Sequence, residues 1–317
     1  MAMIVMAGLD PFALFRALPG AFAQGLLWGI VGIGVFITFK ILDIADLTID
    51  GTLATGGATA VMCILAGIPA PMAVVIATLV GAAAGLLTGF FHTTLGIPAI
   101  LAGILSQIAL YSINLNIMGR SNQAVSVDQY HLVLSLRYIP MAILVGVIFN
   151  VVIMVALYWF MGTEYGTTLR ATGCNQTMAS AQGISTKKAI VVGLVLSNAL
   201  VGLAGGLLAQ YQGNSDVNMG RGAIVIGLAA VIIGEVIGGA LLGKRMGFFA
   251  TLLFVVIGGV IYYLVIIIVL WLKLNSNDLK LFTAVIVALF LALPYLRGQK
   301  KSSFARFRKR KEAGTDA

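Results

Sequence analysis

Residues 163–188 read TEYGTTLRATGCNQTMASAQGISTKK, and they separate two long apolar stretches of the chain. The segment combines glycines and other small residues with one central arginine, Arg170. The segment has helical character, and a plain loop would not require this mixture of glycines, small residues and one arginine. We therefore expect a polar helical element here, set between helices of a very different kind.

The composition outside this segment is that of a membrane protein. The 317 residues are 60% hydrophobic and only 10% charged, whereas a soluble protein carries about 25% charged residues. Several apolar runs reach the roughly 20 residues that cross the hydrocarbon core of a bilayer. No polar block outside the C-terminal tail approaches the size of a soluble domain, about 50 residues at least. We predict a single transmembrane domain over 1–296 and a basic tail over 297–317.

The predicted fold is an all-α polytopic membrane protein with about 8–10 transmembrane helices, because lipid leaves the backbone of an open strand without hydrogen-bond partners. Gly81-x-x-x-Gly85 and the glycines at 202, 205 and 206 predict close helix packing. Cys63 and Cys174 are expected to be unpaired. The apolar spans fall at about 20–39, 50–66, 70–91, 98–118, 140–161, 189–210, 222–242, 247–272 and 279–296.

The distribution of lysine and arginine predicts the orientation. If each span crosses once, the basic residues of 163–188, the pair Lys244-Arg245 and the tail all lie on one side, which the positive-inside rule makes cytoplasmic. Attraction to anionic lipid is a second use for the tail, whereas nucleic-acid binding would require a folded module that it lacks. The basic tail residues are Arg297, Lys300, Lys301, Arg306, Arg308, Lys309, Arg310 and Lys311.

Two places interrupt the apolar pattern. The first carries Asp43, Asp46 and Asp50 just before a short span rich in Gly, Ala and Thr. Asp46 or Thr48 is suited to cap the free N–H groups of a helix that begins inside the membrane. These residues either only stabilise the break or also line a solute path.

The second interruption is the glycine-dense stretch 234–243, which contains Glu235. An embedded acid is costly unless it is paired or hydrated, so Glu235 either bonds locally, contacts the pathway or meets a partner subunit. Interrupted segments in corresponding halves of a chain are typical of transporters with inverted repeats, although the two halves here share little sequence.

Enzymatic interpretations have little support. Asp46 and Asp50 form a D-x-x-x-D pair like those of intramembrane Mg²⁺-dependent transferases, but a second carboxylate cluster is missing. The run 238–245 resembles a P-loop, yet Arg245 stands where the Mg²⁺-binding hydroxyl belongs. We expect no catalytic residues, metal or cofactor in this chain.

Residues 163–188 resemble the cytoplasmic coupling loop of bacterial ABC-importer permeases of the branched-chain amino acid and ribose type. The likeness extends over about 22–296, including the break 44–51 and the helix 188–206, in which Val201 replaces the family's second alanine. The matching loop residues are Gly166, Leu169, Arg170, Ala171, Gly173, Asn175, Ala179, Gly183, Ile184, Lys187 and Lys188.

The resemblance implies a bacterial plasma-membrane permease that pairs with a second copy. Two cytoplasmic ATPase subunits would bind ATP and Mg²⁺, and an extracellular binding protein would deliver the solute. The residues expected near the ATPase are Leu169, Arg170, Ala171, Gly173, Asn175 and Gly183. The residues expected along the solute pathway are Asp46, Thr48, Asp50, Gln107, Asn114 and Glu235.

The sequence is closest in likeness to the branch associated with aromatic amino acid uptake, so an amino acid is the expected solute. An ion-coupled secondary transporter that uses Asp46 and Glu235 is the alternative, and the Mg²⁺-dependent transferase is a second alternative. The residues alone do not separate import from export.

Overall fold

A computed structural model describes residues 11–243 and 247–271, together with the single residues 281, 284, 285, 288 and 292. The predicted span 279–296, the tail 297–317 and the pair Lys244-Arg245 lie outside the continuously described ranges. The long helices are α2 (Pro11–Phe36), α3 (Thr48–Leu65), α4 (Ala70–Thr93), α5 (Ala99–Met118), α6 (Ile139–Gly162), α9 (Thr186–Gln212), α10 (Ala223–Leu242) and α11 (Phe248–Trp271).

The fold class predicted from the sequence is confirmed. Within the part of the chain that the structure describes, eight helices are long and apolar enough to cross a membrane, and each coincides with a predicted span. The first span differs, because α2 begins at Pro11 and passes through Pro19 before it continues as the π-helical turn η1 (Ile37–Ile41). Cys63 and Cys174 are both free, as expected.

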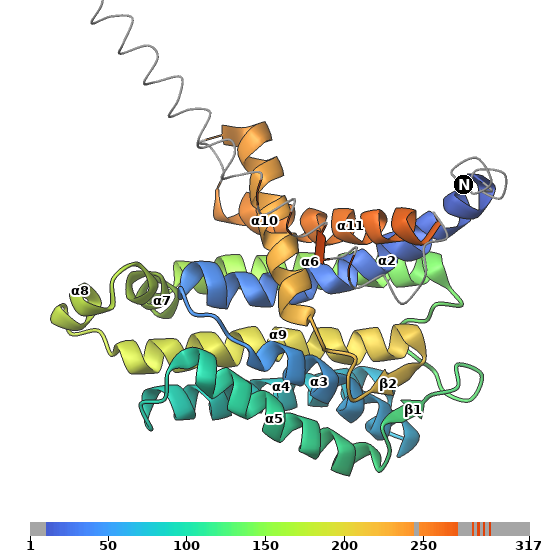
Figure 1. Cartoon of the computed structure of the whole chain (residues 1–317), viewed down its shortest axis with the longest axis horizontal. Helices are drawn as coiled ribbons and strands as arrows, with labels where there is room; N and C mark the ends of the chain where they lie inside the picture. Colours follow the sequence, from blue (N-terminus) through green and yellow to red (C-terminus); the bar gives the residue numbers. More distant parts are fainter. Residues whose placement is uncertain are drawn as a thin grey trace, which may run out of the picture.

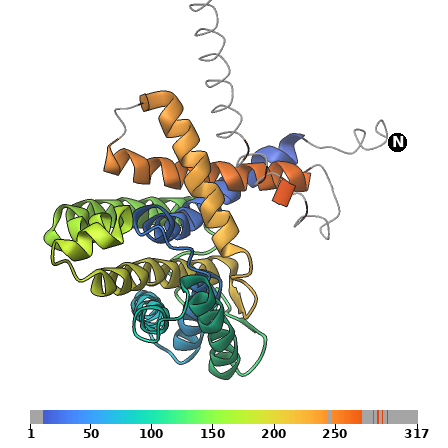
Figure 2. The same cartoon turned by 60° about the vertical axis from the view of Figure 1, so that its left-hand side comes forward.

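The two ends of the helix bundle differ in structure (Figure 1). The short helices α7 (Glu164–Cys174) and α8 (Gln176–Ala181) project at one end. At the other end the strands β1 (Asn122–Ala124) and β2 (Asn214–Asp216) form an antiparallel pair in which Gln123 lies opposite Ser215. Helix α10 runs across the others at a steep angle, as Figure 2 shows from a second side.

The most enclosed spans are those of α2, α3 and α9. Within their most apolar windows, α3 is 78% buried by protein, whereas α5 and α6 are each 28% buried. Helix α9 packs against α3 and α4, and α11 packs against α2 and α10. The short Gly, Ala and Thr-rich span is therefore enclosed by other helices.

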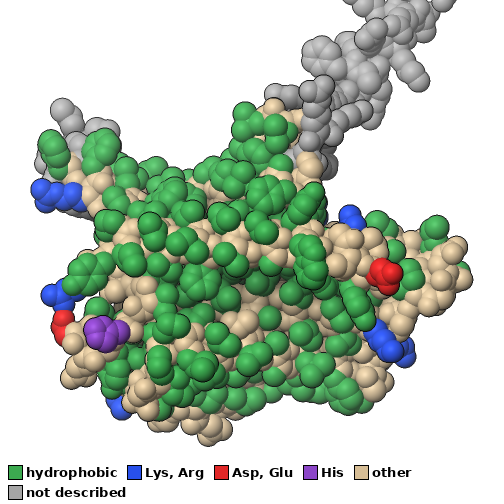
Figure 3. All heavy atoms as spheres, turned by 180° about the vertical axis from the view of Figure 1, so that it is seen from behind, with side chains coloured by type: hydrophobic (Ala, Val, Ile, Leu, Met, Phe, Trp, Pro, Cys, Tyr) green, Lys and Arg blue, Asp and Glu red, His purple; other side chains and the backbone are tan. Residues whose placement is uncertain are grey.

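The outer surface matches a lipid environment. In Figure 3, hydrophobic side chains cover the middle of the visible face, and charged side chains gather at its two ends. The large exposed apolar side chains are distributed over α4, α5, α6 and α11, and include Leu79, Leu86, Ile108, Leu144, Val152 and Leu253. An apolar band between two charged ends is expected where lipid tails are the solvent.

The predicted small-residue packing is confirmed at the α3–α4–α9 contacts. A Cβ atom added to Gly81 would lie 2.4 Å from the carbonyl oxygen of Asn198, and one added to Gly205 would lie 2.1 Å from that of Leu53. Both positions therefore require hydrogen in place of a side chain.

This packing predicts a difference between two glycine substitutions. Gly205→Ala should destabilise the protein by about 1–3 kcal/mol, because the new methyl group meets backbone that cannot move aside. Gly239→Ala is the matched control, since no described atom lies within 4 Å of the added Cβ atom. Thermal unfolding of the detergent-solubilised variants checks the difference, and equal midpoints would contradict it.

Candidate functional site

The chain changes direction between α2 and α3. The turn η1 ends at Ile41, and Asp43 then adopts a positive φ of 56°, which Asp tolerates better than most residues. The Ile44 N–H donates to the Thr38 carbonyl at 2.9 Å, which returns the chain past the end of η1. Helix α3 begins four residues later, so the first two spans are separated by non-helical backbone.

Asp46 holds this break together. Its side chain is 2% exposed. One carboxylate oxygen accepts a hydrogen bond from the Thr48 N–H at 2.9 Å, and the other accepts from the Asn198 amide on α9 at 2.7 Å. A carboxylate buried among apolar helices needs such partners, because desolvation is otherwise uncompensated. Asp46 therefore stabilises the start of α3.

Asp50 joins two helix beginnings. It lies in the first turn of α3, and its two carboxylate oxygens accept from the Gly222 and Ile224 N–H groups, each at 3.0 Å. These donors belong to the start of α10, where free N–H groups and the helix dipole favour a negative charge. The beginnings of α3 and α10 therefore meet at one carboxylate.

A cavity of about 230 Å³ opens beside Asp50. Three of the predicted pathway residues contribute to its wall, namely Asp50, Gln107 and Asn114. Asp46 and Thr48 do not line it, and the Thr48 hydroxyl instead bonds the Thr88 hydroxyl at 2.7 Å. The whole lining is Asp50, Gly51, Gln107, Ile108, Tyr111, Asn114, Val217, Asn218 and Arg221.

Six of the nine wall residues were not singled out from the sequence, among them Arg221 and Tyr111. Arg221 lies between the predicted spans 189–210 and 222–242, and Tyr111 lies inside the predicted span 98–118. A cation placed directly before a helix that begins inside the membrane was the available signal for Arg221. Nothing in the local sequence marks Tyr111, since its place in the wall depends on how α5 packs on α3.

Glu235 lies elsewhere and has a specific partner. Its carboxylate pairs with the Lys40 ammonium group at 2.9 Å, which joins α10 to η1. The sequence reasoning did not foresee this partner. The pair therefore links α10, whose start is hydrogen-bonded to Asp50, to the turn η1 that precedes the break.

The polar segment 163–188 forms α7 and α8, as predicted. The Thr163 hydroxyl accepts from the Gly166 N–H at the start of α7, and the Asn175 side chain accepts from the Met178 N–H at 2.9 Å at the start of α8. Gly183 ends the segment with a φ of +80°, which a residue with a side chain rarely adopts. Local side-chain caps thus explain where α7 and α8 begin, and the conformation of Gly183 explains why the chain turns after α8.

The predicted coupling residues divide between two faces of this segment. Leu169 is 1% exposed and lies close to Gly193 of α9. A Cβ atom at Gly173 would overlap the Ile41 carbonyl oxygen, so α7 rests directly on the end of η1. Arg170, Asn175 and Gly183 are exposed, and Ala171 is partly exposed.

The Arg170 guanidinium group donates to the Met161 carbonyl at 2.8 Å. This contact secures α7 to the end of α6. A displacement of α7 would therefore act on α6 through Arg170 and on η1 through Gly173.

Comparison with known proteins gives these features a context. The family model for the permease component of branched-chain amino acid transport systems matches residues 18–294. The chain belongs to this family. It is therefore a permease component of an ABC transporter, a multi-pass membrane subunit whose family is non-catalytic.

Several curated permeases are similar to the chain. A tyrosine transport system permease protein of Clostridioides difficile is 36% identical over 283 residues, which cover 89% of this chain and 93% of that protein. The D-allose permease AlsC of Escherichia coli is 30% identical over 252 residues, covering 76% and 71%. The nucleoside ABC transporter permease NupC of Lactococcus lactis is 34% identical over 149 residues, covering 46% and 45%. No solved structure matches the chain significantly.

Within the described residues, no three His, Cys, Asp or Glu side chains lie close enough together to hold a metal ion. Asp46 and Asp50 each use both carboxylate oxygens as acceptors for protein N–H groups. The permease break is thus organised around helix ends.

The Lys40–Glu235 pair predicts a compensating charge reversal. Lys40→Glu or Glu235→Lys alone should lower the unfolding midpoint of the permease, because each places like charges side by side. The double reversal should restore most of the loss, with a coupling energy of about 0.5–1 kcal/mol for these partly exposed groups. Thermal unfolding of the four proteins measures it. Strictly additive losses would show that the two side chains do not interact.

Proposed function

We propose that the chain is the translocating subunit of an ATP-driven importer for a small zwitterionic solute, an aromatic amino acid. The observation that carries the proposal is the α7–α8 segment, which is exposed on one face and packed against η1 and α9 on the other. Such a segment is suited to receive a second protein and to pass its movement to the membrane helices.

The ATPase is expected on the end of the bundle that carries α7 and α8. Arg170, Lys187 and Lys188 are exposed there, and basic residues favour the cytoplasmic side. Two ATPase subunits, which would bind ATP and Mg²⁺, would dock on a pair of permease copies. The exposed Arg170, Asn175 and Gly183 would lie around the surface that contacts the ATPase. The inward-facing Leu169 and Gly173 would transmit its movement to the membrane helices.

The same geometry gives a route for that movement. Gly173 rests on the Ile41 carbonyl, and Lys40 of the same turn pairs with Glu235 of α10. The start of α10 in turn donates hydrogen bonds to Asp50. Closure of the ATPase pair would shift α7 and so bias α10 between two packings that open the cavity to one side or the other.

The amino acid assignment draws on similarity to the tyrosine transport system permease, the relative that covers the most of this chain among those described above. The sugar and nucleoside permeases match less of it. A binding protein on the β1–β2 side would deliver the solute. The structure offers less to a secondary transporter that uses Asp46 and Glu235, because Asp46 already accepts two hydrogen bonds and Glu235 is paired with Lys40.

A substitution on the exposed face tests the ATPase contact. Met178 on α8 is 63% exposed, and Met178→Glu should remove the ATPase from the purified permease without loss of thermal stability. Leu136→Glu is the matched control, since Leu136 is exposed in the segment that follows β1. Mass spectrometry of the co-purified subunits gives the stoichiometry. Retention of the ATPase by Met178→Glu would place its contact elsewhere.

Uptake into vesicles tests the solute and the energy source. Vesicles that contain the permease, its ATPase and its binding protein should accumulate labelled L-tyrosine only with ATP inside the compartment that represents the cytoplasm. Labelled ribose is the control solute. Uptake that follows a Na⁺ or H⁺ gradient without ATP would favour the secondary transporter, and accumulation of ribose alone would overturn the amino acid assignment.

A further inference from the structure

The cavity beside Asp50 has an unusual arrangement of charge. Its wall contains one acid, Asp50, and one base, Arg221, which form no salt bridge with each other. The Asp50 oxygens are directed to the amides of Gly222 and Ile224, so the carboxylate is held by the start of α10. Opposite charges that share a small cavity in a membrane protein would ordinarily pair.

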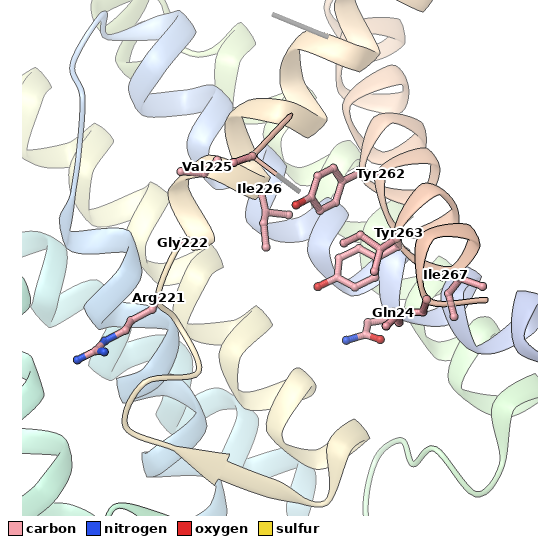
Figure 4. A pocket seen from close by; sticks show the side chains of 11 residues that line it. Gln24, Arg221, Gly222, Val225, Ile226, Tyr262, Tyr263 and Ile267 are labelled. Atoms are coloured by element: carbon pink, nitrogen blue, oxygen red, sulfur yellow. The ribbon is translucent and has the colours of Figure 1, made fainter. Parts of the chain in front are cut away.

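The Arg221 side chain is oriented away from the neighbouring aromatic cluster. A second cavity of about 630 Å³ lies on the other side of the start of α10, and Arg221, Gln24, Tyr262 and Tyr263 contribute to its wall. Figure 4 shows the guanidinium group directed away from Tyr262 and Tyr263 and toward the side of α3. The guanidinium group therefore lies on the side of the smaller cavity.

A buried amide in the same wall is unsatisfied. Asn114 of α5 is 0% exposed, and within the described part of the chain neither its amide nitrogen nor its oxygen has a hydrogen-bond partner. Buried polar groups in proteins nearly always have partners, and an exception calls for a ligand or a bound water. The exposed Tyr111 and the partly exposed Gln107 lie on the same helix, one turn and two turns away from Asn114 respectively.

The cavity lies where a solute from outside would meet the break. Asp50 is near the inner start of α3, about four turns from the end of that helix at Leu65. Val217 and Asn218 of the wall directly follow β2, in the connection to α10, and β2 lies at the opposite end from α7 and α8. The volume of about 230 Å³ suits a solute smaller than the drug-sized ligands of pockets of roughly 300–1,000 Å³.

We propose that this cavity binds the amino acid head of the transported solute, with Arg221 on the carboxylate and with Asp50 and the Asn114 amide oxygen facing the ammonium group. The assignment rests on the proposed function. One fixed positive and one fixed negative charge match a zwitterion, and Arg221 would make charge-assisted hydrogen bonds to its carboxylate. A neutral sugar would leave both charges uncompensated, and an anion would face Asp50.

Protection of an introduced cysteine tests the site directly. Cys63 and Cys174 are the two cysteines of the chain, so Cys63→Ser with Cys174→Ser gives a cysteine-free background. Asn218→Cys then places a reporter at the exposed rim of the cavity. The permease–ATPase complex in lipid vesicles without nucleotide is treated with a membrane-impermeant maleimide, and the labelling rate is measured.

L-Tyrosine should slow labelling of Asn218→Cys, whereas tyramine, which lacks the carboxylate, and 3-(4-hydroxyphenyl)propionate, which lacks the ammonium group, should not. Adding Arg221→Ala should raise the L-tyrosine concentration for half protection about tenfold or more, the usual scale of a lost charge-assisted hydrogen bond. Arg221→Lys should restore part of the protection. Met141→Cys on the exposed face of α6 is the control reporter, which no ligand should protect.

The outcomes separate this site from the proposed function. Equal protection by tyramine, or unchanged protection in Arg221→Ala, would overturn the assignment of the carboxylate to Arg221. Absent protection in a complex that still imports L-tyrosine would overturn the site and leave the importer intact. Protection by ribose in place of L-tyrosine would overturn the assignment of the cavity to a zwitterionic solute. A permease that neither binds an ATPase nor takes up solute would overturn the proposed function itself.

Discussion

The need to satisfy two carboxylates in an apolar surrounding organises this permease. Asp46 accepts from the first amide of α3 and from Asn198, and Asp50 accepts from two amides at the start of α10. A helix that begins inside a membrane presents free N–H groups that lipid cannot satisfy, and each acid supplies the missing acceptors. Acids and helix starts thus stabilise each other, and the position of one determines the position of the other.

Close packing around α3 makes this arrangement possible. Helix α9 approaches α3 so closely that Gly205 nearly meets the Leu53 carbonyl, which brings Asn198 within reach of Asp46. The same Asn198 accepts a hydrogen bond from Thr52, so one amide on α9 secures both the break and the first turns of α3. Small residues at the interface are therefore a condition for the polar contacts.

The polar break and the exposed segment are mechanically connected through few groups. Helix α7 meets the end of η1 at Gly173, and Lys40 of η1 pairs with Glu235 on α10. Because the start of α10 is hydrogen-bonded to Asp50, a rigid displacement at one end of the bundle reaches the wall of the cavity through one close backbone contact and one ion pair. Transporters in which one bundle rocks against another rely on such connections.

The sequence by itself determined the membrane class, the eight described spans and the polar helices between the fifth and sixth of them. It also determined that the acids near the break cap a helix. These features depend on length, hydropathy and capping, which act between near neighbours in the chain. Only the tertiary structure decided which helix start Asp50 serves, that Glu235 meets Lys40, and that Gln107 and Asn114 share a wall with Arg221. Those contacts join residues far apart in the chain, and their geometry follows from how helices with glycine faces cross, which the one-dimensional pattern does not contain.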